Sequence, residues 1–241
     1  MKEKLYTVPV NDAFQEDTEC PICSMYTKLE NDAVSFMMGP SYMEDDIRME
    51  TDEKGFCEKH LSMLLSEKNR LGLALILKTH LDRQAFEAQS FAGKKIKPKA
   101  LLKKSEPADF SAWATAHTGA CYICERINLV YPYYLGTVFY LYKKEPEFRD
   151  KFNACKGFCQ KHAAELIEGA RSELSGTDLQ NFYDTVLKLY TENIKRVAGD
   201  LDWFVQKFDY RFKDEPWKNA KDSIERAAVK TGGIMPEENK N

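Results

Sequence analysis

A cysteine–histidine signature occurs twice in this chain of 241 residues and constrains its fold more than any other feature. Each copy contains a Cys-x-x-Cys motif and, further along, the run Gly-Phe-Cys-x-Lys-His. The two motifs recur at intervals of 101 and 102 residues, so the copies keep register. Three thiolates and one imidazole form the closed tetrahedral ligand set of a structural zinc site. We therefore expect two zinc ions, held by Cys20, Cys23, Cys57, His60, Cys121, Cys124, Cys159 and His162.

The spacing within each motif suits metal binding. When Cys-x-x-Cys begins a helix, both sulfurs can face one centre, and free backbone N–H groups lower the pKa of the thiols. A cysteine and a histidine three residues apart share one face of a helix. Gly55 and Gly157 precede these pairs, where a tight turn with positive φ would strain other residues. Spacing does not decide whether ligands pair within one copy or across copies, although pairing within a copy is simpler.

Other metal and thiol chemistries remain open. An iron–sulfur cluster also uses cysteines at short spacing, and Cys20-Pro-Ile-Cys23 is compatible with a thioredoxin-like dithiol, although the βαβ context of that motif is missing. The seventh cysteine, Cys155, is interpreted as a buried spare thiol; its alternatives are replacement of His162 as a ligand and a redox role. His80 is interpreted as a core or surface histidine. For His117, which precedes Cys121 by four residues, a role in orienting a metal ligand is the alternative to having no role at the site.

Apolar residues recur at helical spacing along nearly the whole chain, as from Leu179 to Phe208. The sequence therefore predicts an all-α fold of two tandem helical repeats, each stapled by a CCCH metal site, plus a C-terminal helical extension. In each repeat, Cys-x-x-Cys opens a helix, a short acidic helix follows, Gly-Phe-Cys opens another helix, and a long helix ends the repeat. An extended N-terminal arm is expected over residues 5–10. The predicted divisions are a first repeat at 1–91, a lysine-rich linker at 92–110, a second repeat at 111–207, and an extension at 208–241 that frays from Gly232.

Charge, apolar runs and cysteine count argue against several classes of function and location for this protein. The net charge of −3 shows no basic excess, so nucleic-acid binding is not favoured. The lysine-rich linker is interpreted as a solvated connector, with an anion-binding arm as the alternative. No apolar run approaches the roughly 20 residues of a membrane helix, and no secretory leader is evident. Seven cysteines, an odd number, indicate reduced thiols. We expect a cytoplasmic protein that does not bind membranes.

No nucleophile–base pair, phosphate-binding loop or paired carboxylate motif indicates an enzyme. The sequence favours a zinc-stapled binding or interaction scaffold whose partner is a protein or a small-molecule ligand. The tyrosine-rich stretch 130–142 motivates this hypothesis, because tyrosines can line an interface. The alternative for Tyr131, Tyr134 and Tyr142 is plain core packing. The alternative function is an iron–sulfur or thiol-based redox protein that uses the same CCCH sites.

A resemblance covers most of the chain. It rests on Cys20-Pro-Ile-Cys23, the two Gly-Phe-Cys-x-Lys-His runs, and the sequence Phe208-Asp-Tyr-Arg-Phe-Lys-Asp-Glu-Pro-Trp217. Together these motifs resemble a family of uncharacterised bacterial proteins known only as a domain of unknown function. The resemblance implies a bacterial cytosolic protein and transfers no activity.

Overall fold

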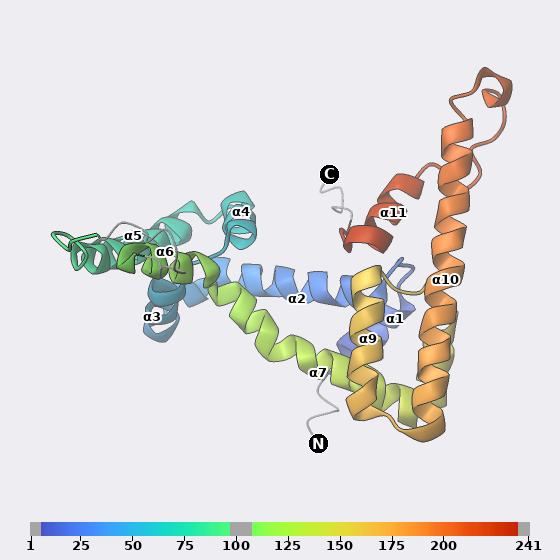
Figure 1. Ribbon diagram of the computed structural model, residues 1–241, viewed down its shortest axis with the longest axis horizontal. Helices are drawn as coiled ribbons and strands as arrows, with labels where there is room; N and C mark the ends of the chain where they lie inside the picture. Colours follow the sequence, from blue (N-terminus) through green and yellow to red (C-terminus); the bar gives the residue numbers. More distant parts are fainter. Residues whose placement is uncertain (1–5, 97–107, 236–241) are drawn as a thin grey trace, which may run out of the picture. The chain divides into compact units, whose positions relative to one another are not determined.

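The computed structural model describes residues 6–96 and 108–235, and within these ranges the regular structure is entirely helical (Figure 1). The all-α prediction is confirmed. The helices are, in chain order, α1 (Thr7–Gln15), α2 (Pro21–Met38), η2 (Pro40–Met43), α3 (Asp45–Lys54), α4 (Glu58–Ser66), α5 (Arg70–Gln89), α6 (Asp109–Gly119), α7 (Tyr122–Lys144), α8 (Pro146–Ala154), α9 (Gln160–Glu173), α10 (Gly176–Gln206), η3 (Tyr210–Phe212) and α11 (Ser223–Gly232).

The chain forms two compact units that do not coincide with the halves of the sequence signature. Unit 1 comprises Met1–Lys28 and Val130–Asn241, and unit 2 comprises Leu29–Leu129. The boundaries fall inside α2 and α7, so each of these helices contributes residues to both units. The tandem repeats at 1–91 and 111–207 stay a prediction about the sequence. The compact units of the structure have different bounds, because unit 1 combines two separate segments of the chain.

The core of unit 1 is built from phenylalanines supplied by several helices. Phe152 of α8 is fully buried and lies at its centre. Its ring centroid lies 5.5 Å from that of Phe14 in α1, 5.3 Å from Phe158 and 5.2 Å from Phe182 in α10. Burying one such ring contributes roughly 1.5–3 kcal/mol. Helix α9 packs along the long helix α10, as Figure 1 shows. This packing fixes the N-terminus of α9, where two predicted ligands lie.

The core of unit 2 is aliphatic rather than aromatic. Leu64 of α4 is fully buried, as are Met37 of α2 and Ile123 of α7, while Ile76 of α5 is 1% exposed. Helix α5 packs against α3 and α4. The backbone N–H of Tyr122, at the beginning of α7, donates to the carbonyl of Gly55 at 3.1 Å, which holds the beginning of α7 beside the turn that leads into α4.

The order of elements expected for each copy of the signature is present. Each Cys-x-x-Cys leads into a long helix, α2 or α7, and a short helix, α3 or α8, precedes each Gly-Phe-Cys. The second ligand pair then opens α4 or α9, before the long helices α5 and α10. That the two copies form tandem structural repeats stays a prediction.

The expected extended arm at residues 5–10 is wrong for the part that is described, because helix α1 begins at Thr7. Pro9 lies in the first turn of α1, where its missing N–H costs no helical hydrogen bond. Val10, Ala13 and Phe14 are buried on one face of the helix. The strand-like pattern of residues 5–10 therefore did not decide the local structure. A helix forms instead, because it buries one apolar face in unit 1.

Two further predictions fall partly outside the described residues. Most of the linker, residues 97–107, lies outside them, but α6 begins at Asp109, inside the predicted linker. The prediction that the chain frays from Gly232 is wrong for the first residues of this segment. Gly232 is the last residue of α11, and the N–H of Gly233, its C-cap, donates to the carbonyl of Val229. Residues 236–241 lie outside the described residues. Within residues 6–96 and 108–235, no helix has the length and apolar character needed to cross a bilayer.

Candidate metal centres

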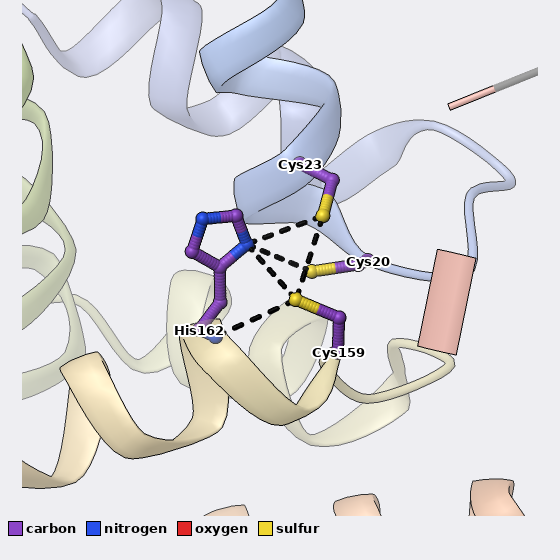
Figure 2. Close-up of side chains that lie close together, drawn as sticks. All are labelled: Cys20, Cys23, Cys159 and His162. Atoms are coloured by element: carbon purple, nitrogen blue, oxygen red, sulfur yellow. Dashed lines mark hydrogen bonds between the residues drawn. The ribbon is translucent and has the colours of Figure 1, made fainter. Parts of the chain in front are cut away.

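The first group of ligand atoms lies in unit 1 and comprises Cys20, Cys23, Cys159 and His162 (Figure 2). The Nδ1 atom of His162 lies 3.2 Å from the sulfur of Cys23, 3.3 Å from that of Cys159 and 3.6 Å from that of Cys20. The sulfurs of Cys23 and Cys159 are 3.6 Å apart. All four residues are buried, and Cys20 is fully inaccessible. Figure 2 shows the sulfurs and the ring nitrogen converging on one centre.

The second group lies in unit 2 and comprises Cys57, His60, Cys121 and Cys124. The Nδ1 atom of His60 lies 3.3 Å from each of the three sulfurs. The sulfurs of Cys57 and Cys124 are 3.8 Å apart. His60 and Cys121 are buried, whereas Cys57 and Cys124 are partly exposed. This site is therefore more open to solvent than the site in unit 1.

These separations match a tetrahedron around one small cation. With metal–sulfur bonds of about 2.3 Å and metal–nitrogen bonds of about 2.05 Å, tetrahedral angles place two sulfurs about 3.8 Å apart and a sulfur and nitrogen about 3.6 Å apart. The observed sulfur–sulfur distances of 3.6 and 3.8 Å agree closely with this expectation. The sulfur–nitrogen distances range from 3.2 Å to the expected value of 3.6 Å. Each group could hold one metal ion.

The ligands pair across the two copies of the sequence signature. The Cys-x-x-Cys of the first copy meets the Cys-x-x-His of the second, and the reverse holds for the other group. The simpler pairing within a copy is therefore not the arrangement found. Core packing accounts for this pairing in unit 1, because Cys20, Cys23 and Cys159 belong to the same buried cluster as the phenylalanines of α1, α8 and α10. All eight predicted residues are brought together; that they bind metal stays a prediction.

The backbone around each second ligand pair has the expected form. Cys57 and Cys159 are the N-caps of α4 and α9, with extended backbone. The sulfur of Cys159 accepts a hydrogen bond from the backbone N–H of His162 at 3.4 Å. Gly55 and Gly157 have φ values of 59° and 76°, which confirms the turns expected from the sequence. Backbone donors and helix N-termini favour negatively charged sulfur, the form that binds metal.

The ionisable groups of the unit 2 site interact strongly. Burial opposes ionisation of Cys121, but the ring of His60 and the N–H of Cys124 lower the pKa of Cys121 to about 6. Burial and the charge of Cys121 raise the pKa of Cys124 to about 12. Burial disfavours the charged ring of His60, yet hydrogen bonds to Cys121 and Glu30 raise its pKa to about 10. The site therefore retains protons at neutral pH unless a cation replaces them.

The unit 1 site behaves in the same way. Hydrogen bonds from Cys20 and Cys23 lower the pKa of Cys159, while Cys159 and Cys20 raise the pKa of Cys23. Burial opposes the charged form of His162, but the sulfurs of Cys159 and Cys20 raise its pKa to about 9. The thiol of Cys159 thus ionises readily, and its negative charge then opposes ionisation of the thiol of Cys23. A divalent cation offsets this mutual repulsion, since neighbouring negative charges cannot otherwise all form in a buried site.

A carboxylate lies beside the other nitrogen of each ligand histidine, and it is buried in unit 2 and partly exposed in unit 1. The Nε2 atom of His60 lies 3.0 Å from Oε1 of Glu30, a residue of α2 whose side chain is 6% exposed. The Nε2 atom of His162 lies 3.8 Å from Glu165, which accepts a hydrogen bond from the Tyr131 hydroxyl at 2.7 Å. At hydrogen-bond distance, as for Glu30, a carboxylate keeps the proton on Nε2 and leaves Nδ1 free to bind the ion.

Sequence reasoning missed these carboxylates. Glu165 follows His162 by three residues on the same helix, and this spacing could have indicated it. Glu30 precedes His60 by 30 residues, so no local signal connects them. His117, for which an orienting role was only the alternative, has its Nε2 3.2 Å from Glu87, and its Nδ1 contacts the carbonyl of Trp113.

The remaining thiol and histidine lie outside both ligand groups. Cys155 is the C-cap of α8, and burial raises its pKa to about 11, so it is a neutral thiol at neutral pH. His80 contacts the carbonyl of Asp52 through Nδ1 at 2.8 Å. Its ring packs over Gly55, where an added Cβ would lie 2.6 Å from Nε2. His80 thus supports the turn that leads into the unit 2 site.

The tyrosine-rich stretch 130–142 lies within α7, which continues through Pro132. Tyr142 is 3% exposed, and its ring packs edge-on against Phe152 and Phe182. Tyr131 and Tyr134 are partly buried against the same core. Core packing of unit 1 therefore accounts for these three tyrosines.

The chain belongs to DUF6062, a family of unknown function, whose model matches residues 1–238. No curated protein and no solved structure matches the chain.

Proposed function

Because membership of DUF6062 brings no activity with it, we propose from the geometry that this protein binds two zinc ions, one in each Cys3His group. The observation that supports this proposal best is the convergence of four ligand atoms, all within 4.8 Å of one another, in each group. Thiolate and imidazole are ligands that zinc favours at structural sites. A cluster of several iron atoms would need its ligand atoms further apart than a single ion does, so these distances favour one ion in each site.

The proposed ions act as structural staples. In unit 1 the ion joins the beginning of α2 to the beginning of α9, and in unit 2 it joins the beginnings of α4 and α7. Four protein ligands leave no coordination position for a substrate. The ions therefore stabilise the two units rather than catalyse a reaction.

We assign the protein the role of a cytoplasmic interaction scaffold with a protein or small-molecule partner. Apolar side chains exposed near the end of α10 support this part of the proposal. Val205 is 67% exposed, Phe208 is 76% exposed and Tyr210 is 86% exposed. Exposed aromatic side chains such as Phe208 and Tyr210 are enriched at protein interfaces.

Metal analysis of protein purified without added metal tests the zinc proposal. We expect about two zinc ions per chain, colourless protein, and intense visible absorption bands after cobalt replaces zinc in a tetrahedral thiolate site. A brown protein with iron and inorganic sulfide would instead establish the iron–sulfur alternative. Protein that folds fully in the presence of a strong chelator, without bound metal, would refute the structural role.

Substitution of the exposed aromatics tests the scaffold proposal. A chain with Phe208→Ser and Tyr210→Ser should keep its metal content and melting temperature but lose a specific partner captured by the unaltered chain. Val8→Ser, which alters an exposed apolar residue of α1, serves as the control and should retain the partner. Identical partner sets for all three proteins would exclude this surface.

A further inference from the structure

The two sites differ in how they are covered, and α11 is the element that covers the site in unit 1. This helix packs against α9 and α10. Gly233, at its C-terminal end, has a φ of 66°. A Cβ atom added there would lie 3.4 Å from the sulfur of Cys23 and 3.7 Å from that of Cys159. The backbone of Gly233 therefore lies directly against two of the three ligand sulfurs.

A buried lysine holds α11 in this position. Lys230 is 1% exposed, and its ammonium group donates to the carbonyl of Glu19 at 2.5 Å and to the carbonyl of Lys156. It also lies 3.1 Å from the carboxylate of Glu19. Glu19 immediately precedes Cys20, and Lys156 immediately precedes the turn at Gly157. One side chain thus ties α11 to the backbone before each of the two ligand pairs, which compensates for burial of its charge.

The site in unit 2 has two ligands within reach of solvent. Cys57 and Cys124 are partly exposed, whereas Cys20, Cys23 and Cys159 are at most 2% exposed. The exposed pair has its sulfurs 3.8 Å apart. A reagent that reaches one of these sulfurs therefore acts on the coordination of the ion itself.

We propose that Cys57 and Cys124 form a modification site at which soft electrophiles release the metal of unit 2, while α11 shields the metal of unit 1. The inference rests on the proposed zinc binding. In the step, a thiolate sulfur attacks the carbon of an alkylating agent, a sulfur–carbon bond forms, the carbon–halogen bond breaks and halide leaves. The thioether product is a poor zinc ligand, so the ion passes to solvent. Unit 1 keeps its ion because the electrophile does not reach its sulfurs.

Alkylation of the full chain with iodoacetamide tests the order of reaction. Metal content is measured first, then peptide mass spectrometry follows each cysteine while a chromogenic chelator reports released zinc. We expect Cys57 and Cys124 to react at least about ten-fold faster than the unit 1 ligands, with release of one of the two ions. Equal rates, or faster reaction in unit 1, would overturn the proposal.

Substitutions in α11 test its role as a cover. Lys230→Gln should speed alkylation of Cys20, Cys23 and Cys159 and leave Cys57 unchanged. The control is Lys221→Gln, which alters an exposed lysine just before α11 and should change neither site. Gly233→Ala is a second, milder variant, because only its positive φ and a close sulfur contact are perturbed. Unchanged protection in a folded variant of either residue would refute the cover.

The outcomes separate this inference from the zinc proposal. Two bound ions with equal alkylation rates would leave zinc binding intact and remove the cover. Protein without bound metal whose unit 1 cysteines still react slowly would refute zinc binding and the proposed metal release, although the cover itself would stand.

Discussion

Replacing Glu30 should weaken metal binding in unit 2 alone. Its carboxylate is buried and lies 3.0 Å from Nε2 of His60, the nitrogen that does not face the sulfurs. Glu30→Gln keeps the size of the side chain and removes its charge. Glutamine then accepts a hydrogen bond more weakly, so the ring loses both its fixed tautomer and part of its basicity.

The magnitude follows from the contacts of this carboxylate. Loss of an outer-shell partner typically lowers metal affinity by about 10–100-fold, which corresponds to roughly 1.4–2.7 kcal/mol. Lys59 also contacts Glu30, with its Nζ 2.6 Å from Oε1, but the lysine side chain is 63% exposed. Water replaces that ion pair at little cost. We therefore attribute nearly all of the expected effect to the hydrogen bond with His60.

Competition with a chelator of known affinity measures both sites in one titration. The Glu30→Gln protein should show one ion bound as tightly as before and one ion bound about 10–100-fold more weakly. Asp32→Asn, an exposed position on the same helix, is the matched control and should leave both affinities unchanged. Equal weakening of both ions, or a change smaller than about two-fold in unit 2, would show that Glu30 does not orient the ligand.

The remaining predictions concern ligand pairing, pH and the turns. Combining Cys20→Ser with Cys159→Ser should cost one zinc ion, whereas combining it with Cys57→Ser should cost both; the reverse result in metal analysis would restore pairing within each copy. Because the ligand histidines have raised pKa values of about 10 and about 9, the metal-free units gain stability from their protonation below pH 6.5 and lose it as the pH rises through those values. Zinc displaces these protons, so affinity should rise with pH, and calorimetry in buffers of different ionisation enthalpy should detect proton release; no release would contradict the ionisation described. Gly157→Ala should lower the free energy of unfolding by about 2 kcal/mol or more, because its Cβ would lie 2.7 Å from a backbone carbonyl of α10 at positive φ. Gly199→Ala, in open space on α10, should instead raise it by about 0.5–1 kcal/mol, and chemical denaturation distinguishes the two.

Local chemistry made much of the site predictable. Metal ligands need particular residue types, and a spacing of three residues on a helix places two of them on one face. Gly55 and Gly157 were identifiable for the same reason, since a turn with positive φ favours glycine. The helical character of the chain followed from apolar spacing, which depends only on neighbouring residues.

Features that depend on contacts between distant residues could not be predicted from local sequence. Nothing near Val10 in the sequence reveals that its helix buries one face in unit 1. Glu30 and Lys230 reach the sites from elements 30 or more residues away. Gly233 belongs to a segment whose composition indicates a loose tail, yet packing places it against two sulfurs.

Pairing of the ligands shows the division between sequence and tertiary structure most clearly. Residue types and spacing alone indicated the eight ligand residues and the helices that present them. It could not determine the partners, because closing the longer loop from Cys20 to Cys159 instead of the loop to Cys57 costs only about 1 kcal/mol more in chain entropy. Burial of a single ring such as Phe152, which is fully enclosed in unit 1, contributes roughly 1.5–3 kcal/mol and outweighs that difference. Core packing, which joins α1, α8, α9 and α10, therefore decided which cysteines face one another and which site is left partly open.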